Sequence, residues 1–465
     1  MESQGRAAVR EPGIVTSLAS IRLTLLLVLI AGYLVFGYPF MQLRIPPTGL
    51  GVPLGELALA ALLLMINWPM VLARIGTVTT LIPLLLWWGW GFARLVVDGI
   101  HEGPWAFRDA TQLIEALYLI VGFAVAVEFA DIARLSRWFR RIIAVSCALG
   151  MLYVFADDIV AISPTLPGGS DQAIPIFGAF ATTATMLLMG AFLCMIQSGR
   201  SRLETLAYTL LAGFLVSYVV LVIQARTTYV QFLALAGLVV VVRPSAVRRL
   251  GSTIPILGAL LVIVSALELR VSGRLSSEIS FSFLWDHIMT IFGVGSTGNL
   301  GEAASGVSLR FHWWLRLYDA LTSDPATLLS GLGFGVALPD SRDPLGVLAR
   351  EPHNSIISVV ARLGLIGGLA WIWFQVELFR LAFVTYRATL RLGWSDQAQL
   401  VLLIMAFAVL TLSSCFGEDT MEKPYNAIPY YALWGVLLRI AYRVRASMAG
   451  AAVSSATMTP ARSVS

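Results

Sequence analysis

Charged residues are scarce in this sequence. Only 13% of its 465 residues are Asp, Glu, Lys or Arg, whereas 58% are hydrophobic, and the mean hydropathy is +0.81. A chain with so few charges cannot cover its surface with solvated groups, so a water-soluble globular protein is excluded. Because a lipid-facing chain must satisfy its backbone hydrogen bonds internally, we expect an all-α, polytopic membrane protein folded as one helical bundle.

Lysine and cysteine are rarer still, with one lysine and three cysteines in the chain. Cys147, Cys194 and Cys415 lie in separate apolar runs without a Cys-x-x-Cys spacing, so neither a disulfide framework nor a zinc site is indicated. No other residue spacing predicts a metal site. The net charge of +5 comes from arginines spread over short connections, which favours contact with membrane lipids over nucleic-acid binding.

The motifs of nucleotide-dependent enzymes are absent as well. The chain has neither a Gly-x-x-x-x-Gly-Lys-[Ser/Thr] loop nor an Asp-x-Asp pair for a metal-bound nucleotide donor, and no cofactor is expected. There are four histidines, and His353 stands in "REPHNS" directly before a long apolar run. A side chain that titrates near neutral pH at the point of re-entry into a membrane is a candidate functional group. The others, His101, His287 and His312, are interpreted as structural.

Apolar runs of about 20 residues recur along the chain, and each can cross a bilayer at about 1.5 Å per residue. They predict nine transmembrane helices within 20–269 and three within 354–441, around a long loop over 270–353. Segment 1–19 is expected to be a cytoplasmic N-terminus and segment 442–465 a cytoplasmic disordered tail. The twelve predicted spans are 20–40, 53–73, 78–98, 109–130, 141–161, 176–197, 204–225, 227–243, 253–269, 354–377, 397–416 and 424–441.

Arginines fall in alternate connections between these spans, and positive charge in short loops is retained in the cytoplasm. This pattern predicts that both termini are cytoplasmic and that the long loop lies on the outer face, where long loops are frequently functional. The arginine-bearing connections contain Arg74, then Arg134, Arg137, Arg140 and Arg141, then Arg200 and Arg202, then Arg243, Arg248 and Arg249, then Arg380, Arg387 and Arg391.

Within the long loop, "SLRFHWWLRLYDALTSDP" has the periodicity of a short amphipathic helix, with Ser308 as its N-cap and Pro325 as its stop. We expect this helix to lie on the outer leaflet. Its apolar face holds Phe311, Trp314, Leu315, Tyr318 and Leu321, and its opposite face holds Arg310, Trp313, Arg316 and Asp319.

Two further features have both a structural and a functional interpretation. Gly331, Gly333 and Gly335 in "GLGFG" either form an ordinary turn or aim backbone N–H groups at an anion. Arg226 in "QARTTY" is held near the outer membrane surface, because 204–242 must contain two crossings. It is either a snorkelling anchor or a fixed positive charge facing a lipid-linked diphosphate, and Arg310 is either a solvated charge or a second such group.

The segments "SLRFHWWLRLYDAL", "LLSGLGFG" and "PHNSIISVVARLGLIGG", in this order and spacing, resemble the signature region of the O-antigen ligase and polymerase superfamily. His353 and Asn354, followed by Gly364 and Gly367, match the HNx9GxxG pattern that ends the large periplasmic loop of these proteins. The predicted layout and the isolated arginine of "QARTTY" are similar as well. The resemblance therefore covers most of the chain, with motif detail at 226–230 and 308–368.

This resemblance implies an enzyme of the bacterial inner membrane with its active site on the periplasmic side. The implied reaction transfers a glycan from undecaprenyl diphosphate to an acceptor sugar hydroxyl, on lipid A-core or on a growing polysaccharide, in lipopolysaccharide or exopolysaccharide assembly. His353 is then the general base, and Arg226 and Arg310 bind the diphosphate. Supporting roles fall to Asn354, Arg316, Asp319 and Glu351.

Two departures leave the type of enzyme open between O-antigen ligase and O-antigen or exopolysaccharide polymerase. Gly368 and Leu369 stand where ligases typically have a Thr-Thr pair, and Arg362 stands where many relatives are acidic. No carboxylate stands out as a covalent nucleophile, which favours a single inverting displacement. A membrane transporter or flippase for lipid-linked oligosaccharide would share the topology, and the intramembrane residues Arg94, Glu115 and Glu128 keep this alternative open.

Overall fold

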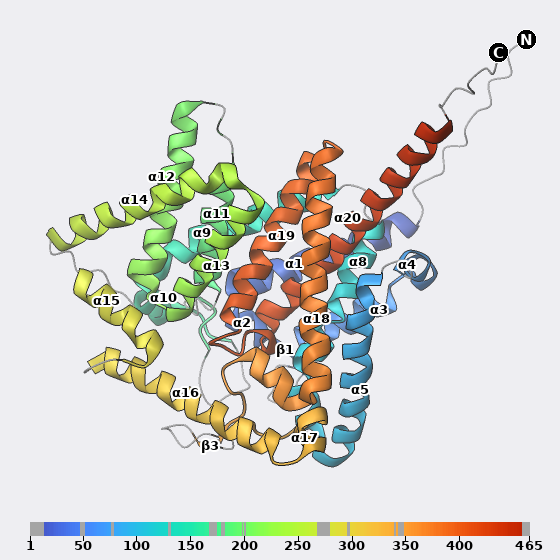
Figure 1. The fold of residues 1–465 in the computed structure, drawn as a ribbon, viewed down its shortest axis with the longest axis horizontal. Coiled ribbons are helices and arrows are strands. Elements are labelled where there is room, and N and C mark those ends of the chain that lie inside the picture. The colour runs from blue at the N-terminus through green and yellow to red at the C-terminus, as the bar shows by residue number, and fades with distance from the viewer. Residues whose placement is uncertain are drawn as a thin grey trace, which may run out of the picture.

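The computed structural model describes residues 14–46, 52–75, 79–128, 132–166, 174–177, 182–197, 199, 201–266, 280–294, 298–338, 341–342 and 348–457. The fold is all-α (Figure 1). The strands in this part of the chain are two antiparallel pairs of two residues each. β1 (Arg44–Ile45) pairs with β2 (Val52–Pro53), and β3 (Ser341–Arg342) pairs with β4 (Leu348–Ala349).

A helix or a group of broken helices coincides with every predicted apolar run. In chain order these are α1 (Ile14–Phe36) with α2 (Tyr38–Met41), α3 (Leu54–Leu64) with α4 (Trp68–Ile75), α5 (Ile82–Glu102), α7 (Thr111–Glu115) with α8 (Tyr118–Glu128), α9 (Ile132–Gly150) with α10 (Ala156–Ile162), α11 (Thr183–Ile196), α12 (Arg202–Tyr218), α13 (Arg226–Val242), α14 (Val247–Ala266), α18 (Ser355–Arg391), α19 (Ser395–Ser414) and α20 (Pro424–Thr457). The short α6 (Pro104–Asp109) joins α5 to α7.

Fewer of these helices than predicted are both long and apolar enough to cross a membrane alone. In the described part of the chain 7 qualify, or 8 if α3 and α4, which meet at an 86° bend, form one span. Helices α11 and α13 are apolar but contain only 14 and 17 residues. Helices α5 and α20 are longer, but their charged, tryptophan, tyrosine and proline residues lower their hydropathy. By helix length and hydropathy the chain is a multi-pass membrane protein.

The tightest contact in the core joins α8 to α20. Gly122 on α8 and Gly435 on α20 let the two backbones meet, because a Cβ at Gly122 would collide with the carbonyl of Ala432, and one at Gly435 with the carbonyl of Leu119. Small residues allow such close approach between helices in membranes, where packing rather than hydrophobicity drives association. Around this contact the core is aromatic, with Trp87, Tyr118, Phe123, Tyr430, Tyr431 and Trp434 all fully buried.

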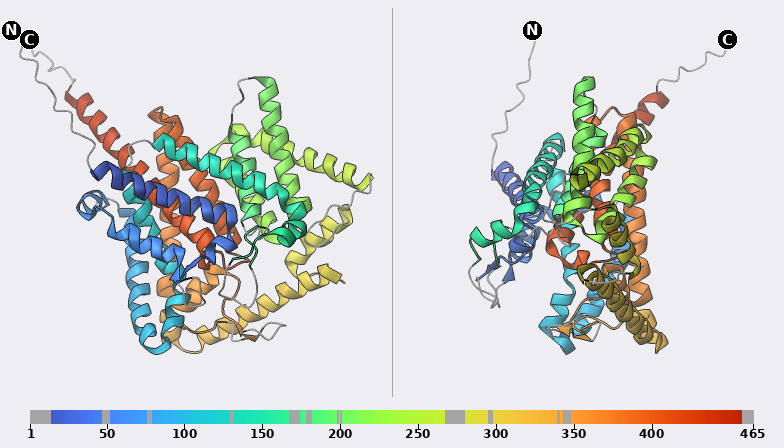
Figure 2. Two further views of the ribbon diagram at one scale, coloured as in Figure 1. Left: turned by 180° about the vertical axis from the view of Figure 1, so that it is seen from behind. Right: turned by 90° about the vertical axis from the view of Figure 1, so that its left-hand side faces the viewer.

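The long loop contains three helices, α15 (Phe281–Met289), α16 (Gly298–Thr322) and α17 (Pro325–Ser330). Helices α16 and α17 lie across one end of the bundle (Figures 1 and 2). The predicted helix start at Ser308 is wrong, since α16 begins more than two turns earlier. Residues 270–279, 295–297, 339–340 and 343–347 of the loop lie outside the described residues. The segment expected as a tail over 442–465 is helical as far as Thr457, in α20, and the last eight residues are not described.

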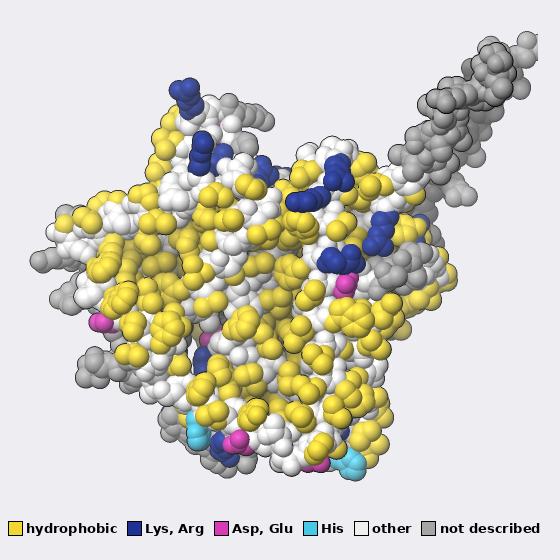
Figure 3. Space-filling model, viewed as in Figure 1, with side chains coloured by type: hydrophobic (Ala, Val, Ile, Leu, Met, Phe, Trp, Pro, Cys, Tyr) yellow, Lys and Arg dark blue, Asp and Glu magenta, His cyan; other side chains and the backbone are white. Residues whose placement is uncertain are grey.

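Charge is distributed unevenly between the two ends of the molecule. On the face in Figure 3, Lys and Arg side chains gather over the ends of α12, α18 and α19 that lie opposite to α16 and α17. Hydrophobic side chains cover a broad band between the two ends, as expected for a surface in contact with lipid.

Candidate active site

His353 lies two residues before α18, at the end of the bundle that α16 and α17 cover. Its φ angle is 51°, and the next residue, Asn354, caps the helix. The Asn354 Oδ1 accepts hydrogen bonds from the backbone N–H groups of Ile356 (3.1 Å) and Ile357 (3.0 Å), while its Nδ2 donates to the Phe416 carbonyl (3.0 Å). Such caps satisfy the free N–H groups of a first turn. Asn354 therefore fixes both the start of α18 and its contact with the connection between α19 and α20.

The first segment of α18 ends at Gly364, where the helix is broken. Gly364 has φ 66° and ψ −169°, a region that is essentially restricted to glycine. The "GLGFG" turn packs here, with the Leu332 N–H donating to the Ala361 carbonyl (2.7 Å) and the Gly333 N–H to the Arg362 carbonyl (3.1 Å). The spacing between His353 and Gly364 in the HNx9GxxG pattern thus equals the length of one short, separately oriented helical segment.

The imidazole of His353 faces a carboxylate that the sequence did not single out. Its Nδ1 lies 3.4 Å from Oδ1 of Asp419, and Lys423 Nζ lies 2.7 Å from the same oxygen. The other side of the ring stacks on Trp313, with 6.0 Å between ring centroids. The His353 side chain is 36% exposed and that of Asp419 15%, so the histidine remains accessible while its partner is covered.

The ionisation of Asp419 follows from these contacts. Burial alone would raise the pKa of Asp419, but the hydrogen bond from His353 and the positive charge of Lys423 outweigh burial and hold this pKa well below its ordinary range. Asp419 is therefore an anion at neutral pH and orients the His353 ring. The only available signal for Asp419 was that the stretch "GEDTMEKP" is mainly acidic, and it carries no recognisable spacing.

Arg310 reaches the same connection from α16. Its Nη1 donates to the Gly417 carbonyl (2.6 Å), and its Nη2 lies 3.8 Å from Oε1 of Glu418. The structure thus gathers His353, Asn354 and Arg310 around residues 415–423, which connect α19 to α20. A guanidinium whose backbone partner fixes one end can still donate its remaining N–H groups to an anionic ligand.

Helix α16 turns Arg310, Trp313, Leu317 and Leu321 toward the body of the protein, so the inward face mixes residues of both predicted faces and the predicted division is wrong. Trp313 is buried (4% exposed), as are Leu317 and Leu321, which pack with Leu338 and Ala361 in a small separate core. Its predicted apolar face is largely exposed, with Phe311, Leu315 and Tyr318 on the surface. This orientation brings Arg310 to the site and leaves an apolar face suited to contact with lipid.

The other predicted site residues lie elsewhere. Arg316 and Asp319 are exposed on α16. Glu351 faces α18, where its Oε1 accepts from Nη2 of Arg362 (2.8 Å) and its Oε2 from the Ser358 hydroxyl (3.1 Å). Arg226 is the first residue of α13, and its Nη1 donates to the Thr290 carbonyl beyond α15 (3.4 Å).

Arg226 and His353 nevertheless share one feature, which is a strained backbone at or near the residue. Among the described residues, the non-glycine residues with positive φ are Gln224, at 49°, and His353. Gln224 follows a short π-helix, η3 (Val219–Ile223), and precedes Arg226 by two residues. π-Helical turns and left-handed residues are costly and concentrate at functional sites. One strained position is therefore His353 itself, and the other lies two residues before Arg226.

The glycine turn binds carboxylates of the chain itself. The Phe334 N–H donates to Asp98 Oδ2 (2.8 Å) and the Gly335 N–H to Asp109 Oδ2 (3.1 Å). Asp109 also pairs with Arg350 Nη2 (2.7 Å) and Arg362 Nη1 (3.1 Å). This buried cluster joins α6, the long loop and α18. The turn therefore anchors the loop beside the site, and these two N–H groups are already occupied.

The ligand atoms of His353, Glu418 and Asp419 lie within 4.8 Å of one another, close enough to hold a metal ion. Positive side chains already oppose both carboxylates, however, with Lys423 at Asp419 and Arg310 near Glu418. A divalent cation would be repelled by both, so the group fits an ion-pair network better than a metal centre.

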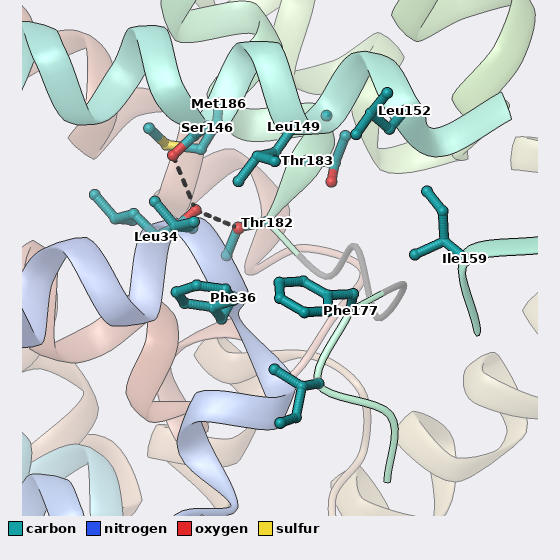
Figure 4. A pocket seen from close by; sticks show the side chains of 13 residues that line it. Leu34, Phe36, Ser146, Leu149, Leu152, Ile159, Phe177, Thr182, Thr183 and Met186 are labelled. Atoms are coloured by element: carbon teal, nitrogen blue, oxygen red, sulfur yellow. Dashed lines mark hydrogen bonds between the residues drawn. The ribbon is translucent and has the colours of Figure 1, made fainter. Parts of the chain in front are cut away.

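Two apolar hollows lie apart from His353. One, of about 180 Å³, lies between the end of α1, α9 and α11 (Figure 4), and the hydroxyls of Ser146 and Thr182 beside it both donate to the Leu34 carbonyl (3.2 and 2.9 Å). The other is an open groove of about 780 Å³ between α5 and α18. Neither of these two hollows is lined by a charged side chain. No known protein family and no curated protein matches this chain.

Proposed function

We propose that the protein is a glycosyltransferase of the O-antigen ligase and polymerase type, which transfers a glycan from undecaprenyl diphosphate to a sugar hydroxyl. One observation carries the proposal. An accessible histidine, His353, contacts the anionic Asp419 just before the start of α18. The guanidinium of Arg310 contacts the same 415–423 connection that carries Asp419. A base, its orienting carboxylate and an anion-binding group are the parts that this transfer needs.

In the proposed reaction the acceptor hydroxyl attacks the anomeric carbon of the donor. His353 takes the hydroxyl proton as the new C–O bond forms. The bond between the anomeric carbon and the diphosphate breaks, and the electron pair leaves with the lipid-linked diphosphate. A single displacement of this kind inverts the anomeric carbon, and a trapped glycosyl-enzyme would contradict it.

The leaving group determines the role of the arginines. A diphosphate gains negative charge as it departs, and a planar guanidinium stabilises it by two parallel hydrogen bonds. Arg310 supplies this group at the site, and Arg226 supplies a second at the membrane surface, beside the strained Gln224. Neither a metal ion nor a nucleotide is required, because the donor is already activated.

The proposed setting is the bacterial inner membrane, with twelve crossings, both termini in the cytoplasm and the site on the periplasmic side. The arginine-rich ends of α12, α18 and α19 are consistent with a cytoplasmic end, because positive charge is retained there. The donor headgroup would then lie level with α16, whose exposed apolar face suits the outer leaflet.

The test compares host glycans, separately for lipid A-linked and undecaprenyl-linked material, in a deletion strain complemented with variants. We expect His353→Ala to lower transfer by roughly 10²- to 10⁴-fold. His312→Ala, which changes an exposed histidine on α16, is the matched control and should restore transfer. Long chains stranded on undecaprenyl diphosphate indicate a ligase, and single repeats on the carrier indicate a polymerase. Full rescue by His353→Ala would refute the site.

One observation favours transport as a second candidate function. Glu115 on α7 is 1% exposed, and neither carboxylate oxygen has a hydrogen-bond partner in the described part of the chain. Intramembrane carboxylates often mark ion or proton pathways. A transporter requires that Glu115→Gln abolish export of lipid-linked sugar while His353→Ala leaves it intact. The glycosyltransferase requires the opposite pattern.

A further inference from the structure

A small internal cavity lies beneath the first segment of α18. Its volume is about 20 Å³, and its polar lining comes from Asp109, Gln112, Ser358, Arg362 and Glu422. A cavity needs roughly 10–15 Å³ to hold one water molecule, which must also find two to four polar partners. The cavity therefore has the size and the polarity for one water.

Three side chains that line this cavity contribute polar atoms without a partner among the described residues. These atoms are Gln112 Nε2, Arg362 Nε and Glu422 Oε1. Gln112 is 6% and Arg362 3% exposed, so bulk water cannot compensate. Two are donors and one is a carboxyl oxygen, and they come from α7, α18 and η6 (Thr420–Glu422). One water can accept from both donors and donate to the carboxyl oxygen.

The second oxygen of Glu422 contacts the start of α18. Its Oε2 lies 2.5 Å from the Ser355 hydroxyl oxygen, which also accepts from the Met421 N–H (3.0 Å) and lies 3.4 Å from the Glu418 carbonyl. Ser355 has one hydroxyl hydrogen. If Glu422 is neutral, its O–H donates to Ser355, and Ser355 donates to the Glu418 carbonyl. All these groups then have a partner.

The electrostatic surroundings favour the neutral form. Burial raises the pKa of Glu422 to about 8, and the nearby carboxylates of Glu351 and Asp419 act in the same direction, against the hydrogen bond with Ser355. The charged or titratable groups on the elements packed around it are Asp109 on α6, Glu115 on α7, Glu351 before α18, Arg362 on α18, Cys415 at the end of α19, and Asp419 and Lys423 on its own connection.

We propose that this cavity is a proton-binding site in which neutral Glu422, joined by one water to Gln112 and Arg362, holds the 415–423 connection in the position that presents Asp419 to His353. The functional part of this inference depends on the proposed function, whereas proton binding does not. When Glu422 loses its proton, the Ser355 hydroxyl turns to the new carboxylate and no longer donates to the Glu418 carbonyl. Glu418, which precedes Asp419, then lacks this hydrogen bond. Asp419 is therefore held less firmly against His353, and glycan transfer slows.

Infrared spectroscopy of the full chain in lipid nanodiscs tests proton binding directly. We expect a component of the protonated-carboxyl C=O band at neutral pH that disappears as the pH is raised through about 8, distinct from any contribution of buried Glu115. This component should be missing in Glu422→Gln. It should persist in Glu377→Gln, a control that removes an ionised glutamate paired with Arg380 on α18. A band that is unchanged in Glu422→Gln would overturn the site, as would a wild-type spectrum without pH dependence in this region.

Hydrogen exchange and activity test the consequence. The amides of Ser355 and Met421 should exchange faster in wild type than in Glu422→Gln at pH 9, and equally at pH 6, since glutamine donates to Ser355 at both. Glycan transfer should decline at alkaline pH in wild type and remain constant in Glu422→Gln. Identical exchange and identical pH profiles would overturn the coupling. If no variant transfers glycan while the infrared and exchange differences appear, the proposed function fails and the proton site stands.

Discussion

Three constraints fix the His353 side chain, and each restricts it differently. Its backbone is left-handed, with a φ angle of 51°, Trp313 stacks on one face of the ring, and Asp419 faces Nδ1. These contacts leave Nε2 as the ring nitrogen available to a substrate. A histidine in an ordinary loop would have a freely rotating ring and would lose entropy at each encounter with a substrate.

At the residue scale, Asp419→Asn should slow transfer without abolishing it. The charge-assisted hydrogen bond to the imidazole is worth about 1.5–3 kcal/mol, equivalent to about a tenfold to hundredfold loss. We expect the loss in kcat, with little change in KM, because Asp419 orients the base and does not bind the donor. Steady-state kinetics on a lipid-linked donor measure it, with Asp396→Asn at the far end of α19 as the control. An unchanged kcat would show that Asp419 does not position His353.

The stability of the protein in acid should also depend on Asp419. Its pKa is held below the ordinary value of 3.8, so the unfolded chain takes up this proton before the folded protein does. The contribution of Asp419 to the free energy of unfolding is therefore complete above 3.8 and lost as the pH falls below it. Thermal unfolding should separate wild type from Asp419→Asn at pH 6, and the difference should shrink below about pH 4. A constant difference would contradict the contacts with His353 and Lys423.

At the scale of single elements, the break in α18 determines how its first segment points. Gly364→Ala should destabilise the protein, since the glycine-only backbone region alone costs about 1–3 kcal/mol and the new Cβ would collide with the Leu329 carbonyl. Gly258→Ala on α14, where nothing lies within 4 Å of the new Cβ, is the control and should be neutral or slightly stabilising. Thermal unfolding in detergent compares them. Equal stability of the two variants would mean that the break is not needed.

Helix α16 carries one buried and one exposed leucine, and the effects of their substitution on stability can be compared. Leu317 is 2% exposed in the small core against α18, whereas Leu315 is 50% exposed. Leu317→Ala should cost about 2–5 kcal/mol of stability, as for other buried leucines, and should weaken the contact between Arg310 and Gly417. Leu315→Ala should change stability by less than about 0.5 kcal/mol. Reversed effects would show that α16 is rotated about its axis.

At the scale of the whole molecule, the arginine-rich end and the end covered by α16 should lie on opposite sides of the membrane. Serine replaces the three buried cysteines, and a single cysteine is then introduced at exposed Ser323 or at exposed Ser395. We expect Ser323→Cys to react with a membrane-impermeant maleimide in cells with a permeabilised outer membrane, and Ser395→Cys only after lysis. The reverse labelling would invert the topology, and labelling of both in intact cells would exclude a crossing between them.

The sequence by itself determined the class of the protein and the position of nearly every helix. Apolar run length and the scarcity of charge reflect the cost of placing polar groups in lipid, which is local and additive along the chain. For the same reason the sequence pointed to His353, Asn354 and Arg310, which stand in or beside recognisable patterns. It predicted twelve crossings, whereas 7 or 8 in the described part of the chain are long and apolar enough to cross alone, because neither the short lengths of α11 and α13 nor the bend between α3 and α4 is visible in hydropathy.

Only the tertiary structure decided which residues meet. Asp419 joins His353 across more than sixty residues, because α18 and α19 pack side by side and return the chain to the same end of the bundle. Arg310 and Trp313 turn inward because Leu317 and Leu321 are needed in a core with Ala361, a choice that periodicity within α16 cannot make. The site proposed around Glu422 also depends on tertiary structure, because its buried polar atoms without a partner come from three elements, α7, α18 and η6. Pairings of this kind depend on long-range packing, which no local pattern encodes.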